Sequence, residues 1–395
     1  MSRWEEVDLG NIASVDRNLV APEDLLSEDK YIGLENIERG GGLANVESVV
    51  NAQISSAKAR FHDGHVLFGR LRPYLAKIAR PDFGGVCSTD ILTITPGEFL
   101  DRDYLVHFLV RPEIVDLAAS RTAGANLPRL SSQALMKFKV PLPPLDEQRR
   151  IATVLDKVDA LRARRRQAID LLDELVQSAF ISMFDDPRGN PMGWEREPLG
   201  DLMEHGPQNG VYKPARNYGS GTPIVRIDAF YDGVVRDLGS LRRVDLDENE
   251  VERYGLSCGD VLINRVNSLE YLGKCALIPS LQEPTVFESN MMRFRLDGGR
   301  VDPRYVTQFL QTNFAKSQIL SSAKNAVNQS SINQNDVRGL MVNVPPLGLQ
   351  QEFVARVNVI EGLKEKNRAH LSHLDELFAS IQQRAFRGDL WDEAA

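Results

Sequence analysis

The sequence predicts an α+β fold with two tandem heads of mixed α and β structure and a pair of long antiparallel coiled-coil helices related by pseudo-twofold symmetry. Three observations support this. The chain repeats itself, each copy ends in a segment of helical heptads, and strand-like runs precede helices within each copy. The length of 395 residues suits two or three domains of roughly 150 residues each, and 42% hydrophobic content is typical of a core-forming protein.

The clearest part of the repeat begins at a Pro-Pro-Leu step. Residues 143–184 align with residues 345–386 without a gap, and 12 of the 42 positions are identical, against roughly two or three expected by chance. Upstream the copies match more loosely, and the shift between them grows from 190 to 202 residues. We therefore expect two similar heads, each followed by a helical tail, with insertions in the second head.

Both tails have the apolar spacing of a coiled coil. In the first tail, one set of residues recurs at every seventh position: Ile151, Val158, Arg165, Leu172 and Ala179. A second set lies three positions after the first: Val154, Leu161, Ala168 and Leu175. The second tail repeats the pattern with Phe353, Ile360, Asn367, Leu374 and Ile381, with Leu363 and Leu377 between them. Val357, Leu371 and Phe378 widen this apolar stripe. Spacing of this kind over five heptads predicts two long helices whose a and d positions form the contact.

Two such helices in one chain most simply pack against each other in antiparallel orientation. Equivalent positions of the two copies then meet at mid-helix, where Arg165 and Asn367 stand. We expect these two residues near the pseudo-twofold axis, as a polar pair that fixes the register of the helices. The alternative is that Arg165 extends to solvent.

Within each head, strand-like runs come first and helices later. The expected strands are 66–68, 91–94, 223–227, 261–263 and 292–296, and residues 136–140 alternate as an edge strand. The expected helices are 103–109, 114–120, 303–311 and 315–322. This order favours α+β heads.

No motif in the sequence indicates a catalytic or metal site. Phosphate-binding loops and nucleophile elbows are missing, and Cys87, Cys258 and Cys275 stand apart, which fits a reducing cytoplasm. The pairs His62/His65 and His370/His373 lack carboxylate or thiolate partners at ligand spacing, so we interpret them as structural or surface residues. We therefore expect no catalytic residue, metal or cofactor in this chain, and no run of apolar residues is long enough to cross a membrane.

Polar loops that recur in both copies are the candidates for binding DNA. Arginine and asparagine can pair with guanine and adenine edges, and lysine and tyrosine can hold phosphates. The candidates are Arg70, Arg72, Tyr74 and Lys77 with their counterparts Arg265, Asn267, Tyr271 and Lys274; Asn126 and Arg129 with Asn328 and Gln329; and, in the second copy only, Tyr212 and Lys213. Each loop could equally be an ordinary solvated surface loop, and the net charge of −8 gives no general attraction to nucleic acid.

Several of these segments resemble the specificity (S) subunit of type I restriction–modification systems. They are the junction at 140–151 and its counterpart at 342–353, the strand and turn at 66–77, and the helix ending at 386–390. The second junction departs from the pattern, because Gly348-Leu349 replaces Asp146-Glu147 and a charged helix start is lost. The resemblance implies a first target-recognition domain at 1–145, a central spacer helix at 146–186, a second target-recognition domain at 187–347, a C-terminal spacer helix at 348–388 and a tail at 389–395.

The resemblance also implies a function. Each head would read one half of a bipartite site in double-stranded DNA, and we expect the site to be asymmetric because the recurring loops differ between the heads. The chain itself would be non-catalytic. Two modification subunits using S-adenosylmethionine and restriction or motor subunits using ATP would supply the chemistry. The rival hypotheses are a coiled-coil adaptor whose heads bind proteins and an enzyme with an unrecognised site.

Overall fold

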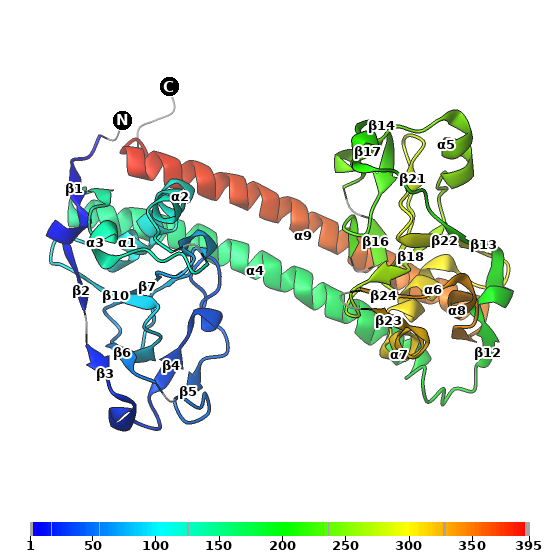
Figure 1. The fold of residues 1–395 in the computed structure, drawn as a ribbon, viewed down its shortest axis with the longest axis horizontal. Coiled ribbons are helices and arrows are strands. Elements are labelled where there is room, and N and C mark those ends of the chain that lie inside the picture. Colours follow the sequence, from blue (N-terminus) through cyan, green and yellow to red (C-terminus); the bar gives the residue numbers. More distant parts are fainter. Residues whose placement is uncertain are drawn as a thin grey trace. The chain divides into compact units, whose positions relative to one another are not determined.

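The computed structural model describes residues 3–391, except positions 17, 55, 125, 232, 236, 327 and 328. The chain divides into two compact units, and each unit contains one head and half of each long helix (Figure 1). Unit 1 holds the residues up to Gln167 and those from Asn367 onward, and unit 2 holds Ala168–Lys366. None of the described helices is long and apolar enough to cross a membrane.

The two long helices are α4, Leu145–Phe184, and α9, Leu347–Arg387. Each begins directly after a Pro-Pro step, where proline restricts the residue before it to extended backbone. In unit 1 the first half of α4 packs against the second half of α9, and in unit 2 the second half of α4 packs against the first half of α9. The packing is therefore antiparallel in each unit, which confirms the predicted fold class.

Only half of the predicted a/d stripe is confirmed: the a positions Ile151, Val158, Phe353 and Ile360 are buried, but the leucines at d are not. The leucines at d are exposed, with 44–48% of their surface open in Leu161, Leu175, Leu363 and Leu377. The positions four residues after each a, the e positions, are buried instead, as in Leu155, Val176, Val357 and Lys364. A period of 3.6 residues allows either stripe, and the cores of the heads decide between them, because Leu155, Val176 and Val357 also pack against residues of the heads.

Head 1 contains two small sheets beside three helices. Its sheets have the strand orders β2-β10-β7-β8 and β3-β6-β9-β4-β5, and β1 pairs with β11. The strands are β1 Glu6–Asp8, β2 Ala13–Asp16, β3 Leu19–Val20, β4 Lys30–Ile32, β5 Glu47–Ser48, β6 Lys58–Phe61, β7 Val66–Gly69, β8 Ile78–Ala79, β9 Gly85–Cys87, β10 Ile91–Pro96 and β11 Lys139–Pro141. The helices are α1 Arg102–Leu109, α2 Pro112–Ser120 and α3 Ser132–Leu135.

Head 2 is built on a larger sheet of order β13-β22-β18-β20-β16-β15, with three smaller sheets. The strands are β12 Glu195–Pro198, β13 Met203–Asn209, β14 Tyr218–Val225, β15 Phe230–Tyr231, β16 Gly233–Val235, β17 Arg243–Val244, β18 Val261–Asn264, β19 Val266–Asn267, β20 Cys275–Leu277, β21 Val286–Phe287, β22 Met291–Leu296, β23 Lys324–Ala326, β24 Gln329–Ser331 and β25 Met341–Val344. The helices are α5 Glu248–Tyr254, α6 Pro303–Leu310, α7 Asn313–Ser322 and α8 Gln334–Arg338.

Two of the expected strands are displaced. The strand expected at 136–140 is β11, which starts only at Lys139, because Ser131 caps the short helix α3 and Met136 continues its last turn. The strand expected at 223–227 is β14, which begins at Tyr218 and ends at Val225. The residues that follow β14 turn away because the N–H of Ile227 donates to the Glu288 carboxylate at 2.7 Å.

A buried glutamine ties each long helix to its own head. Gln148 accepts a hydrogen bond from the N–H of Asp101, just before α1, and donates to the carbonyl of Pro143, both at 2.8 Å. Gln350 does the same in head 2 with Asp302 and Pro345, at 2.8 and 2.7 Å. Both glutamines are completely buried. The repeat seen in the sequence is thus also a repeat of the joint between head and helix.

Candidate nucleic-acid interface

The two candidate loops of head 1 lie side by side. The N–H of Arg72 donates to the carbonyl of Pro128, and the N–H of Leu130 donates to the carbonyl of Arg70, both at 2.9 Å. Arg72 has a left-handed backbone with φ of 51° and leads into a tight turn at Pro73–Leu75. Arg72, Tyr74 and Asn126 are exposed, and half of the surface of Tyr74 is open to solvent. These three side chains can therefore reach a ligand.

The other candidates in head 1 have partners within the head. Arg129 forms a two-point ion pair with Asp90, at 2.7 and 3.1 Å, and this carboxylate raises the pKa of the guanidinium. The ammonium of Lys77 donates to the carbonyl of Leu34 at 2.5 Å. Arg70 is half-buried, and its Nε has no hydrogen-bond partner among the described residues. Arg129 and Lys77 thus hold the loops in place.

In head 2 the corresponding segments form one small antiparallel sheet. β19 pairs with β24, with Asn267 opposite Ser330, and β24 pairs in turn with β23. The N–H of Ile332 donates to the carbonyl of Arg265 at 2.9 Å, which closes the arrangement. Gln329 is exposed and Asn267 is half-buried. Asn328, a further candidate, lies outside the described residues.

The third candidate loop, around Tyr212, is connected to the segment of Arg265 through Ser289. The guanidinium of Arg265 donates to the carbonyl of Ser289 at 3.2 Å, and the N–H of Ser289 donates to the carbonyl of Val211 at 2.9 Å. Tyr212 is 78% exposed at the mouth of a concavity of about 490 Å³. The concavity is also lined by Lys213, Tyr218, Arg226, Arg242, Glu288 and Asn290.

Two of the positive charges that line this concavity are neutralised by acidic residues of head 2. Lys213 pairs with Glu250 at 2.8 Å, which raises the pKa of its ammonium. Arg226 pairs at 3.0 Å with Glu288, whose side chain is almost buried. Tyr218, Arg226, Arg242 and Asn290 were not among the predicted residues, because they lie on other segments that only the fold brings to Tyr212.

Lys274 supports the loop that carries Tyr271. Its ammonium donates to the carbonyl of Ile227 at 2.8 Å and lies 4.0 Å from the ring centre of Tyr231. Tyr271 itself is 40% exposed, and a hydrogen bond with Glu270 raises the pKa of its hydroxyl. Tyr271 is therefore open to a ligand, whereas Lys274 is engaged inside head 2.

Arg165 and Asn367, the two residues expected at mid-helix, come together. Nη1 of Arg165 donates to Oδ1 of Asn367 at 3.1 Å, and both side chains are half-buried. Their positions differ by the same 202 residues that separate the two helical copies.

The expectation that His62 and His65 have no carboxylate neighbour is wrong. Asp16, 49 residues away on β2, lies 2.9 Å from Nε2 of the buried His65. Nδ1 of His65 accepts the N–H of His62 at 2.9 Å, so the proton of the neutral ring is on Nε2 and points to Asp16. This hydrogen bond lowers the pKa of Asp16. Both ring nitrogens are occupied, and the group ties β2 to the turn before β7.

Comparison with known proteins finds one matching family model and several similar proteins. A family model described as the type I restriction modification DNA specificity domain matches residues 1–171. The chain is 28% identical over 325 residues to the StySPI specificity subunit of Salmonella potsdam, covering 78% of this chain and 69% of that protein. It is also 28% identical over 328 residues to the EcoKI specificity subunit of Escherichia coli K12, with the same coverage.

Solved structures show the same fold over nearly the whole chain. The S subunit of a type I restriction–modification system from M. genitalium superposes with a TM-score of 0.59 and 12% identity, covering 98% of this chain and 96% of that one. A chain from a structure of type I restriction–modification assembly superposes with a TM-score of 0.55 and 21% identity, covering 98% of both. The chain is thus similar over most of its length to DNA specificity (S) subunits of type I restriction–modification systems, and residues 1–171 match the specificity domain of that family.

Proposed function

We propose that head 1 and head 2 each read one half of a bipartite, asymmetric DNA sequence. The observation that carries the proposal is the clustering of candidate loops. In each head, segments about 55 to 67 residues apart in the sequence lie next to each other. Direct readout requires such a surface, because several side chains have to reach one stretch of a groove together.

The two heads offer different chemistry to DNA. Head 1 presents Arg72, Tyr74 and Asn126, and head 2 presents Tyr271 and Gln329 beside the concavity at Tyr212. Arginine pairs best with guanine, and asparagine or glutamine with adenine. Unlike sets of side chains would select unlike half-sites, so the target is asymmetric.

The long helices give the half-sites their spacing. A helix of 40 residues measures about 60 Å at ~1.5 Å per residue, which equals roughly 18 base pairs of duplex DNA at ~3.4 Å each. Spacer helices at 146–186 and 348–388 then separate target-recognition domains at 1–145 and 187–347.

The reactions belong to partner subunits. Two modification subunits using S-adenosylmethionine methylate the site, and restriction subunits using ATP cleave unmodified DNA in the cytoplasm. This chain contributes the choice of sequence. Its acidic net charge of −8 implies that the partners supply much of the phosphate contact.

Salt-dependent DNA binding by the complex with modification subunits tests the proposal. Arg72→Glu should weaken binding to duplex DNA that contains the target at least tenfold at low salt. Arg39→Glu makes the same charge change on another exposed loop of head 1 and serves as the matched control. Binding that is insensitive to salt and to Arg72→Glu would contradict the proposal and favour an adaptor that binds proteins.

A further inference from the structure

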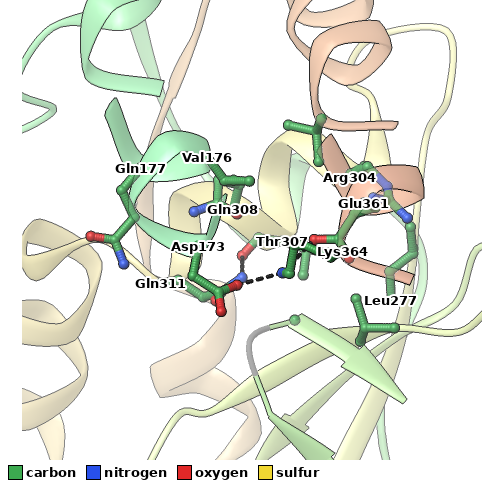
Figure 2. A pocket seen from close by; sticks show the side chains of 13 residues that line it. Asp173, Val176, Gln177, Leu277, Arg304, Thr307, Gln308, Gln311, Glu361 and Lys364 are labelled. Carbon is green, nitrogen blue, oxygen red and sulfur yellow. Dashed lines mark hydrogen bonds and ion pairs between the residues drawn. The ribbon is translucent and has the colours of Figure 1, made fainter. Parts of the chain in front are cut away.

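Two ion triads connect α4 and α9, one in each unit. In unit 1, Arg162 of α4 donates to Asp375 of α9 at 2.5 Å and to Asp159, one turn earlier on α4, at 2.6 Å. In unit 2, the ammonium of Lys364 on α9 lies between Asp173 of α4 and Glu361, and the distance to Glu361 is 2.8 Å. Figure 2 shows both carboxylates converging on Lys364.

The two triads share one construction, to which unit 1 adds Arg166 of α4, 3.6 Å from the same oxygen of Asp375. Every member has its counterpart 202 residues away in the repeat, and each cation reaches across to the acid of the other copy. The equivalent pairs are Asp159 and Glu361, Arg162 and Lys364, and Asp173 and Asp375. The Arg165–Asn367 hydrogen bond in unit 1 adds a third polar contact between the helices.

Both cations occupy e positions and are less exposed than the acids with which they pair. Only 2% of the Lys364 side chain and 19% of the Arg162 side chain are exposed. The guanidinium of Arg162 lies 4.5 Å from the ring centre of Phe378, whose counterpart in unit 2 is the smaller Val176. A cavity of about 70 Å³ adjoins Lys364 and Val176. A charge in such a place is tolerated only while its partners are present.

Of the native register and the two registers shifted by one heptad, only the native one pairs both cations with an acid on the other helix. A slip of one heptad in one direction would put Arg162 opposite Arg368 and Lys364 opposite Arg166, which brings like charges together between the helices. A slip in the other direction would put Lys364 opposite Phe180 and leave its ammonium without an acid. The Arg165–Asn367 pair contains one charge, so it discriminates less strongly between these registers.

We propose that the two triads determine the register of α4 on α9 and thereby set the distance between the two half-sites that the protein reads. The second part rests on the proposed function. A slip of one heptad displaces the helices by about 10 Å, at ~1.5 Å per residue. At ~3.4 Å per base pair this corresponds to a change of about three base pairs in the spacer. The triads are positioning groups and do not contact DNA.

Distances between spin labels on the full chain test the register without DNA. Labels at Ala160 and Ala379 report on unit 1, and labels at Gln177 and Gly362 on unit 2, in a Cys258→Ser background. All four label sites are exposed. A slip of one heptad displaces one helix along the other by about 10 Å, so the separation of the two labels in each pair changes.

The test variant is Asp173→Lys with Asp375→Lys, which turns both triads repulsive. The matched control is Glu174→Lys with Glu376→Lys, the same charge change on neighbouring exposed residues. We expect a second distance population in both units of the test variant and one native distance in the control. If the lysine variant loses its helical circular dichroism, Asp173→Asn with Asp375→Asn should still broaden the distances. Native, narrow distances in a folded variant of either kind would overturn the register role.

A second measurement separates the register role from the proposed function. The complex of the test variant with modification subunits should methylate sites whose spacer differs by about three base pairs, and Lys364→Arg should retain the native spacer because arginine fills this role in unit 1. Slipped label distances with an unchanged spacer would overturn the link between register and half-site distance, while the register role would stand.

Discussion

Gln148 and Gln350 make the same pair of buried hydrogen bonds at the two joints between head and helix, although 202 residues separate them. Gln148→Ala should lower the free energy of unfolding of unit 1 by about 2 kcal/mol, because it leaves the N–H of Asp101 and the carbonyl of Pro143 buried without partners. Urea unfolding of the full chain, followed by a probe in head 1, measures the loss. The exposed Gln177→Ala is the control, and an equal effect of the two would contradict the role of the buried glutamine.

The hydrogen bond between Arg165 and Asn367 should favour one register of the two helices but add little to the stability of the helix pair. Asn367→Ala leaves the half-buried guanidinium without this partner and should destabilise the helix pair by about 1 kcal/mol. Arg165→Leu with Asn367→Leu should recover or exceed the original stability, because apolar residues in a seam avoid the cost of desolvating a charge. Thermal unfolding compares the three proteins. A double leucine variant less stable than Asn367→Ala would contradict this account.

Arg72 and Arg129 should behave differently although both are arginines of neighbouring loops. Arg129→Ala breaks the ion pair with Asp90 and should lower the thermal stability of head 1. Arg72→Ala should leave stability unchanged and weaken recognition of one half-site by about 1–3 kcal/mol, as expected for a lost base contact. Melting curves and methylation rates on DNA with altered half-sites distinguish the two. Loss of stability in Arg72→Ala without any effect on methylation would contradict the assignment.

Acid should weaken the tie between Asp16 and His65. The hydrogen bond from His65 lowers the pKa of Asp16 below its ordinary value of 3.8, so this carboxylate stabilises the folded state above that value. The contribution is lost as pH falls through the lowered pKa. The stability difference between the native protein and Asp16→Asn should therefore shrink as pH is reduced below 3.8, measured by denaturant unfolding at several pH values. A difference that grows on acidification would contradict the stated direction.

Repetition in the sequence was enough to predict the helix pair. The gapless alignment of residues 143–184 with 345–386 predicted two equivalent helices, and these are α4 and α9. What repetition could not predict was which side of each helix faces inward. Leu161 and Leu155 both fit a helical stripe, and only the position of the head core buries Leu155.

Contacts between distant segments also could not be predicted from the sequence. The ion pair of Arg129 with Asp90 joins residues 39 positions apart, and the hydrogen bond of His65 with Asp16 joins residues 49 positions apart. No local sequence pattern predicts either contact. Arg226 and Arg242 line the concavity beside Tyr212 but belong to segments that the repeat does not mark. The sequence therefore predicted candidate side chains by residue type, and tertiary contacts decide which of them are exposed.

Mapping of methylated bases in DNA modified by the complex with modification subunits tests the central claim most directly. The account predicts a bipartite, asymmetric motif with a fixed spacer, in which substitutions at Arg72 or Asn126 alter one half and substitutions at Tyr271 or Gln329 alter the other. A continuous or palindromic motif, or substitutions in one head that change both halves alike, would contradict it.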